Sequence, residues 1–172
     1  LDNSYSFEDL KEWEKRIKKI IDTPIEYTCE LKFDGVSINL TYKDGELVRA
    51  VTRGDGVKGD DVTNNVKTIP TVPLKLRGDF KGEFEARGEI VMPISGFNKL
   101  NLSRIENGEE PFKNPRNTAS GSLKLQDSKE VSKRPLECLL YSVEDSKMFN
   151  NHIEFLKLSL IHISEPTRHG LI

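Results

Sequence analysis

The stretch YTCELKFDGVSINLTYKDGELVRAVTRGDG, residues Tyr27–Gly56, decides the fold of this chain. Apolar and polar residues alternate along it, and the alternation changes phase at Gly35, which a continuous strand cannot do. The stretch therefore predicts a strand over residues 27–34 that ends in a turn or bulge at Gly35. The following Asp44-Gly45 dipeptide is typical of a tight hairpin turn, so a further strand is expected on each side of it.

Lys32 lies inside the first of these strands, with Glu30 and Asp34 two residues away on either side. Residues two apart on a strand share a face, so the three side chains are expected to point the same way. One interpretation is a solvent-exposed face with cross-strand ion pairs. The other is a lysine displayed for chemistry at the end of a strand. A lysine amine reacts only when neutral, and the two acids favour its charged form, so other cations would have to assist.

Further helices and strands are predicted around this stretch. Ser6 and Asp9 form a helix-start signal of the capping-box type, and apolar residues follow at helical spacing. Period-two alternation predicts a strand at Phe84–Pro93, and an apolar run predicts a buried strand at Pro135–Val143. Hairpins with short helices between strands favour an α+β fold, with antiparallel sheets and flanking helices, over a doubly wound one.

Composition narrows the class of protein. The chain has 172 residues, 35% of them hydrophobic and 31% charged, which is typical of one globular domain. A net charge of −2 creates no global basic field for nucleic acid. Cys29 and Cys138 lie far apart and away from the histidines, which argues against a zinc site and favours a reducing, cytosol-like compartment. No apolar run is long enough to span a membrane, and no signal peptide is recognisable.

Both ends of the chain are unusual. The first residue is Leu1 rather than methionine, which is typical of a cut end. Near the other end, Leu158–Arg168 resembles the translation of a transposon-end sequencing adapter, although a strand followed by a loop would have the same composition. We therefore predict a domain over residues 1–157 and a non-native tail over residues 158–172, whose two histidines are excluded from any site.

Of two charged loops, the later one carries cations that could hold phosphate. Arg53–Asp61 is rich in glycine and in charges of both signs, and Lys113, Arg116 and Lys124 lie in a later segment rich in turn formers. Guanidinium groups and backbone N–H groups suit phosphate, but the three cations of the later segment are by themselves more typical of a solvated basic loop. The tripeptide Arg53–Asp55 matches integrin-type adhesion motifs, which is a weak signal without other extracellular features.

Four motifs follow one another along the chain: CELKFDG (29–35), TRGDGVKGDDVTNNVKTI (52–69), RGE (87–89) and NPRNTASGSL (114–123). Together they resemble the adenylation (nucleotidyltransferase) domain of bacterial NAD⁺-dependent DNA ligases over Leu1–Val143, and the last motif is most similar to the Bacteroidetes branch. The Lys-x-Asp-Gly core alone would also fit ATP-dependent ligases and RNA-capping enzymes, whereas the second and fourth motifs favour NAD⁺. The resemblance implies a truncated form of the nucleotidyltransferase fold shared by DNA ligases and mRNA-capping enzymes.

The resemblance also implies a reaction. Lys32 would attack the α-phosphate of NAD⁺, expel nicotinamide mononucleotide and become lysyl-AMP. AMP would then pass to the 5′-phosphate of a DNA nick, and the 3′-hydroxyl would displace it to seal the strand in replication and repair. Splitting one phosphoryl transfer into steps through a covalent intermediate makes each step easier. Asp34, the second implied catalytic residue, would orient the lysine or help to place Mg²⁺ or Mn²⁺.

The implied cofactor-binding residues surround this lysine. Glu30 would accept a hydrogen bond from the adenine amino group and Glu89 from the ribose hydroxyls. Arg53 would contact the nucleotide sugar or phosphate, and Arg116 the phosphates. Leu1 opens a Leu-Asp-Asn run that is similar to the family and completes the set. Lys124 stands where the family commonly has arginine, which keeps the charge but loses the guanidinium fork. We expect the group to line a concave cleft.

Other family features do not occur in this sequence. They are the later strands with an Asp-Gly-Val-Val-Ile-Lys-like block, a further lysine motif, the N-terminal domain that grips nicotinamide mononucleotide, the OB-fold, the helix-hairpin-helix array, the BRCT domain and the zinc finger, which alone would bind Zn²⁺. The implied partners are NAD⁺ and nicked double-stranded DNA. The resemblance also implies a monomer in the bacterial cytosol that does not associate with a membrane. We expect the chain alone to form negligible lysyl-AMP, and an inert gene fragment is the remaining alternative.

Overall fold

The computed structural model describes residues 3–76, 78–144, 152–154 and 156. The chain divides into two compact units, Leu1–Leu31 and Lys32–Ile172, which are described separately. The predicted tail over residues 158–172 lies outside the described residues, as does Leu1. The prediction of a non-native tail therefore stays a prediction.

The first unit contains one helix, α1 (Phe7–Lys18), among its described residues. The Ser6 hydroxyl accepts a hydrogen bond from the Asp9 N–H at 3.1 Å, and the Asp9 carboxylate accepts one from the Ser6 N–H, also at 3.1 Å. This reciprocal pair satisfies two N–H groups that the first turn of a helix leaves without partners. It confirms the capping box predicted from the sequence.

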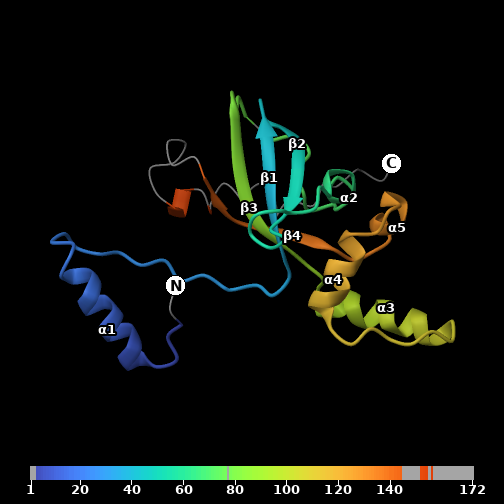
Figure 1. Cartoon of the computed structure of the whole chain (residues 1–172), viewed down its shortest axis with the longest axis horizontal. Coiled ribbons are helices and arrows are strands. Elements are labelled where there is room, and N and C mark those ends of the chain that lie inside the picture. Colours follow the sequence, from blue (N-terminus) through green and yellow to red (C-terminus); the bar gives the residue numbers. More distant parts are fainter. Residues whose placement is uncertain (1–2, 77, 145–151, 155, 157–172) are drawn as a thin grey trace, which may run out of the picture. The chain divides into compact units, whose positions relative to one another are not determined.

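The second unit is built on a four-stranded antiparallel sheet (Figure 1). Its strands, in the order β2-β1-β3-β4, are β1 (Val36–Lys43), β2 (Glu46–Thr52), β3 (Glu83–Val91) and β4 (Glu137–Val143). The turn between the first two strands has positive φ angles at both Asp44 (49°) and Gly45 (79°). A two-residue hairpin turn of this kind needs positive φ at both positions, and glycine and aspartate tolerate it best. The predicted hairpin is confirmed.

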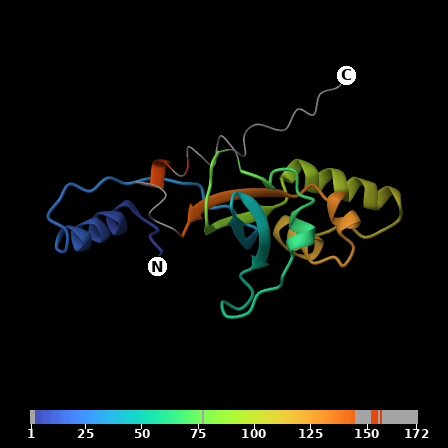
Figure 2. The same ribbon diagram turned by 90° about the horizontal axis from the view of Figure 1, so that it is seen from above.

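One face of the sheet carries the core. In β1 the side chains of Ile38, Leu40 and Tyr42 are buried. The polar residues Ser37 and Asn39 alternate with them and are only partly buried. The buried face packs against α2 (Thr63–Val66), α4 (Pro115–Leu123) and α5 (Ser128–Ser132), through side chains that are almost fully buried: Val66, Ala119, Leu123 and Val131. Figure 2 shows these helices gathered beside the strands together with α3 (Ile94–Glu106). The α+β class is therefore confirmed.

The predicted strand over residues 27–34 is wrong, because β1 begins only at Val36 and the preceding residues have no regular secondary structure. The shared strand face inferred for Glu30, Lys32 and Asp34 is therefore not formed. A strand exists only where a neighbouring strand satisfies its N–H and C=O groups. Opposite Val36 lies Ile90, near the end of β3, and the chain then passes through Pro93, which has no N–H, into α3. The sheet offers no described partner before Val36.

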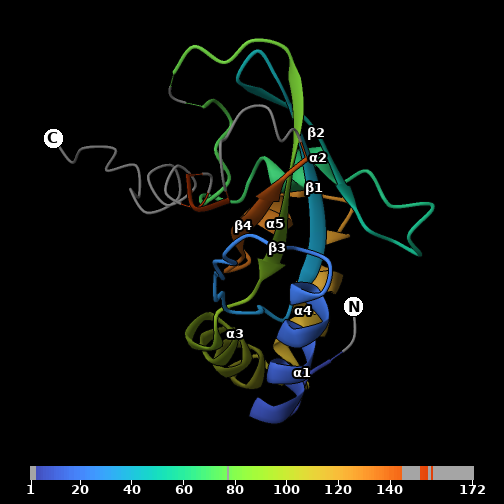
Figure 3. The same ribbon diagram turned by 90° about the vertical axis from the view of Figure 1, so that its left-hand side faces the viewer.

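Helices α3 and α4 lie at the end of the sheet where β1 begins (Figures 1 and 3). Helix α4 starts with Asn114, whose side chain accepts a hydrogen bond from the Asn117 N–H at 3.1 Å, and Pro115 occupies the first helical position. Both are favoured at a helix N-terminus, because asparagine caps an N–H group and proline needs none. The residue that follows, Arg116, is thereby held in the first turn of α4, near the start of β1.

Candidate active site

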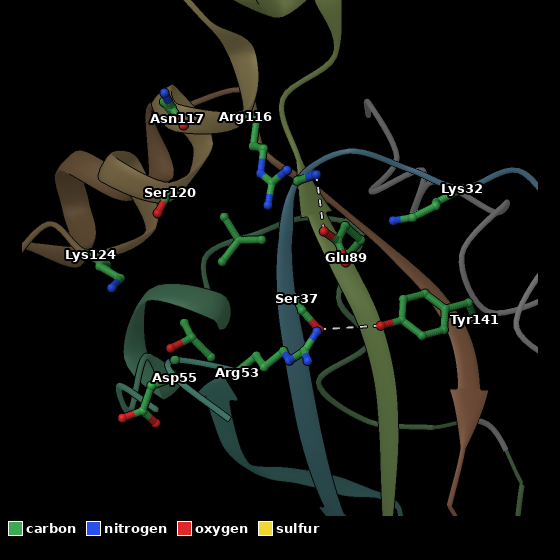
Figure 4. A pocket seen from close by; sticks show the side chains of 14 residues that line it. Lys32, Ser37, Arg53, Asp55, Glu89, Arg116, Asn117, Ser120, Lys124 and Tyr141 are labelled. Carbon is green, nitrogen blue, oxygen red and sulfur yellow. Dashed lines mark hydrogen bonds between the residues drawn. The ribbon is translucent and has the colours of Figure 1, made fainter. Parts of the chain in front are cut away.

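A cleft of about 660 Å³ opens where β1 begins. Figure 4 shows its side chains converging from the chain before β1, from the loop after β2, and from β3, α4 and β4. The lining includes four of the residues predicted from the sequence, Lys32, Arg53, Glu89 and Arg116, together with Lys124. The fold thus gathers around one cavity residues that lie far apart in the sequence.

The backbone before β1 lies directly against β3 at Gly35. A Cβ atom placed on this glycine would lie 2.2 Å from the Ile90 carbonyl oxygen, closer than any side chain tolerates. The Gly35 N–H donates a hydrogen bond of 3.2 Å to Glu89 Oε1. Glycine is required here by this close backbone approach, and the approach fixes the segment that carries Lys32.

Asp34 is connected to the cleft through Arg116, whose Nη1 lies 2.8 Å from Asp34 Oδ1. The Arg116 side chain is 59% exposed and that of Asp34 is 72% exposed, so the pair contributes little net stability. It does place a guanidinium next to one of the two acids that flank Lys32 in sequence. Helix α4 thus supplies a cation to the segment that carries Lys32, and whether it assists the lysine stays a prediction.

The glycine-rich loop after β2 is organised by its own aspartate. Asp55 Oδ1 accepts hydrogen bonds from the N–H groups of Lys58 at 2.7 Å and Val57 at 2.8 Å. These bonds, that of Lys58 first, hold the pKa of Asp55 below its usual range. The carboxylate of the Arg53–Asp55 tripeptide is thus engaged within its own loop, which is a structural role and argues against the adhesion interpretation.

Lys124 lines the cleft from the C-terminal end of α4. It is the lysine that stands where the family that the motifs resemble commonly has arginine. Its Nζ lies 2.6 Å from Asp60 Oδ2, and both side chains are about half exposed. An exposed pair of this kind exchanges partners readily. Lys124 can therefore turn towards an anion in the cleft.

Glu89 is the half-buried acid of the cleft. Burial raises the pKa of its carboxyl above the usual range. The Gly35 N–H bond and the charges of Lys32 and Arg116 offset part of that rise. Both cations line the same cleft as the Glu89 carboxylate (Figure 4).

The raised pKa of Glu89 predicts a pH effect on stability. Because the folded state holds the proton more tightly than the unfolded state, folding is favoured at low pH, and this contribution is lost as pH rises above the ordinary glutamate value of 4.5. We expect Glu89→Gln to be more stable than the wild type at pH 7 and to lose that advantage near pH 4. Urea unfolding at the two pH values checks this, and an equal difference at both would contradict it.

Tyr141 and Ser37 are cleft residues that the sequence analysis missed. The Tyr141 hydroxyl and Ser37 Oγ lie 3.4 Å apart, from β4 and β1 respectively. β4 was predicted only as a buried strand, and its apolar run contains no signal that singles out one tyrosine. Glu30 belongs to the first unit and Leu1 lies outside the described residues, so the roles of both stay predictions.

The described residues contain no group of three or more histidines, cysteines, aspartates or glutamates that could hold a metal ion. In the same part of the chain, no helix has the length and apolar character needed to cross a membrane. The cleft presents two amines and two guanidinium groups beside two carboxylates: Lys32, Lys124, Arg53, Arg116, Asp55 and Glu89. Such a set suits a ligand that carries both phosphate and hydroxyl groups.

Comparison with known proteins agrees with this chemistry. The family model described as the NAD-dependent DNA ligase adenylation domain matches residues 1–165. A DNA ligase of Flavobacterium psychrophilum is 64% identical over 159 residues, which are 91% of this chain and 24% of that protein. A DNA ligase of Christiangramia forsetii is 67% identical over 143 residues (83% and 22%), and one of Cytophaga hutchinsonii is 50% identical over 154 (88% and 23%). The chain spans about a quarter of the length of these relatives.

Proposed function

Since this chain belongs to the NAD-dependent DNA ligase adenylation domain family, we propose that it performs the adenylation step of nick sealing with Lys32 as the nucleophile. The neutral amine forms a bond to the α-phosphorus of NAD⁺, the bond from that phosphorus to nicotinamide mononucleotide breaks, and the amine gives up a proton. Lysyl-AMP remains. The observation that carries the proposal is the convergence of Lys32, Arg116 and Glu89 on one cleft.

The cations of the cleft would act on the phosphates. Arg116 would exchange the Asp34 carboxylate for phosphate oxygens, which its planar fork binds with two hydrogen bonds. Lys124 would leave Asp60 in the same way but would act as a point charge. Both charges would stabilise the transition state, in which negative charge spreads over the transferring group.

The nucleoside would be held by the remaining polar and aromatic groups. Glu89 would accept hydrogen bonds from ribose hydroxyls, and Arg53 would contact the sugar or phosphate from the loop after β2. The Tyr141 ring offers a flat surface on which a base can stack. Glu30 would accept a hydrogen bond from the adenine amino group. These roles are consistent with the nucleotidyltransferase fold that we propose for the complete domain.

A divalent cation fits the donor chemistry of this site only with help from the substrate. Asp34 supplies hard carboxylate oxygens and is largely exposed, whereas Mg²⁺ is commonly bound by one or two carboxylates together with substrate phosphates. We therefore assign Asp34 as the residue that would hold Mg²⁺ or Mn²⁺. The ion would supply further neutralisation of the phosphate charge.

The larger partners follow from the same proposal. AMP on Lys32 is useful to a ligase only if a 5′-phosphate at a nick receives it, so nicked double-stranded DNA is the proposed partner. The activity would serve DNA replication and repair in the bacterial cytosol, with the protein as a monomer. NAD⁺ rather than ATP is the proposed nucleotide donor, since the matching family is NAD-dependent.

The proposal is tested in a full-length ligase that carries residues of this chain. Residues 1–143 replace the matching segment of the Flavobacterium psychrophilum relative, and NAD⁺-dependent sealing of a nicked duplex is measured. We expect the graft to seal and to carry AMP label from NAD⁺ but not from ATP. Lys32→Ala should abolish labelling because it removes the amine. Lys32→Arg should abolish it as well, because the guanidinium keeps the charge but stays protonated. Equal labelling of Lys32→Ala would contradict the proposal.

A further inference from the structure

The segment that carries Lys32 is held from two different elements. On one side, Glu89 of β3 accepts a hydrogen bond of 3.2 Å from the Gly35 N–H. On the other, Arg116 of α4 pairs with Asp34 at 2.8 Å. Among the described residues, these are the hydrogen bonds and ion pairs that connect residues 32–35 to the rest of the second unit.

Sheet pairing does not restrain this segment, because β1 begins after it. The register places Ser37 opposite Glu89 and Val36 opposite Ile90, so the Glu89 side chain projects from β3 beside the last unpaired residues before β1. The hydrogen bond from the Gly35 N–H to Glu89 therefore connects the segment before β1 to β3 beyond the end of the β1–β3 ladder. A side chain here does what a further ladder hydrogen bond would do.

We propose that Glu89 is a positioning residue for the nucleophile, which holds the Gly35 N–H so that the Lys32 segment lies against β3 before any nucleotide binds. This inference rests on the proposed role of Lys32 and gives Glu89 a function in addition to ribose contact. The Gly35 contact requires an acceptor oxygen at the full length of a glutamate side chain. It does not require a negative charge.

That distinction separates two conservative variants. Glu89→Gln keeps an acceptor oxygen at the same distance, whereas Glu89→Asp keeps the charge but shortens the side chain by one methylene. A positioning role therefore predicts that glutamine retains the hold on Gly35 and aspartate loses it. A purely electrostatic role predicts the reverse order.

The first measurement is hydrogen exchange at the Gly35 amide in the 172-residue chain without nucleotide. We expect protection within about threefold of the wild type in Glu89→Gln and a loss of about tenfold or more in Glu89→Asp. Glu85 is the matched control, since it lies on the same strand and accepts a bond of 2.6 Å from Asn39. Glu85→Asp should leave Gly35 unchanged. The Leu40 amide reports whether each variant is folded.

Loss of Gly35 protection in Glu89→Gln, with Leu40 still protected, would overturn the inference. So would full protection in Glu89→Asp. If Glu89→Asp does not fold, the glutamine variant alone decides between these outcomes. Because no nucleotide is present, failure here would leave the proposed function standing, and failure of Lys32 labelling would leave the Gly35 contact standing.

The second measurement is the rate of lysyl-AMP formation in the grafted ligase. A misplaced nucleophile lowers kcat, by about 100-fold for an error near 1 Å, with little change in KM. We expect that pattern in Glu89→Asp, with near-normal kcat restored in Glu89→Gln. A rise in KM with unchanged kcat in Glu89→Asp would show a ribose contact alone and would contradict the positioning role.

Discussion

The variant Gly35→Ala is expected to lose about 2–3 kcal/mol of its free energy of unfolding and to form no detectable lysyl-AMP in the grafted ligase. Its Cβ would lie 2.2 Å from the Ile90 carbonyl oxygen and 2.9 Å from Val91 Cγ1. The nearest atom belongs to the backbone of a central strand, so it cannot move aside without disturbing the ladder. The added methyl group would also push the Gly35 N–H away from Glu89, which displaces Lys32 as well.

Gly121→Ala is the matched control for this substitution. Gly121 lies within α4, and a Cβ placed there meets no atom within 4 Å. Alanine is a better helix former than glycine by about 0.5–1 kcal/mol, so this variant should be slightly more stable than the wild type. Urea unfolding gives both values. A Gly35→Ala protein as stable as the wild type would show that the chain before β1 does not press on β3.

Leu40→Ala is expected to cost about 2–5 kcal/mol, the range for deleting a buried leucine side chain. Leu40 is fully buried at the middle of β1, where it lies opposite Ala50 of β2 and Ala86 of β3. These small neighbours cannot expand to fill the cavity. Domains of this kind are stable by only about 5–15 kcal/mol, so the loss is a large share of the total.

An exposed leucine provides the comparison for Leu40. Leu102 of α3 is 62% exposed, and Leu102→Ala should change the free energy of unfolding by less than about 0.5 kcal/mol. Thermal or urea unfolding of the pair gives the difference directly. Equal stability of the two variants would mean that β1 is not the centre of the core. Because β1 carries Ser37 and follows Gly35 directly, we also expect Leu40→Ala to loosen the cleft.

Local patterns in the sequence determined several parts of this protein. The Asp44-Gly45 hairpin follows from the positive φ angles that these residues tolerate, and the capping box of Ser6 follows from its spacing to Asp9. The alternation that resumes after Gly35 matches the burial of Ile38 and Leu40 in β1. Each of these depends on residues a few positions apart, which is the range over which sequence reasoning is reliable. Through resemblance, the motifs also singled out four of the residues that line the cleft, Lys32, Arg53, Glu89 and Arg116.

Tertiary structure decided the rest. Whether residues 27–34 form a strand depends on a neighbouring chain, and β3 leaves the sheet for α3 after Val91, so no described strand pairs with them. The partner of Asp34 lies 82 positions away, and that of Gly35 lies 54 away. The face that Tyr141 presents depends on the register of β4 against β3, which contains a shift after Arg87. Long-range pairing sets each of these contacts, and no periodicity in the sequence records it.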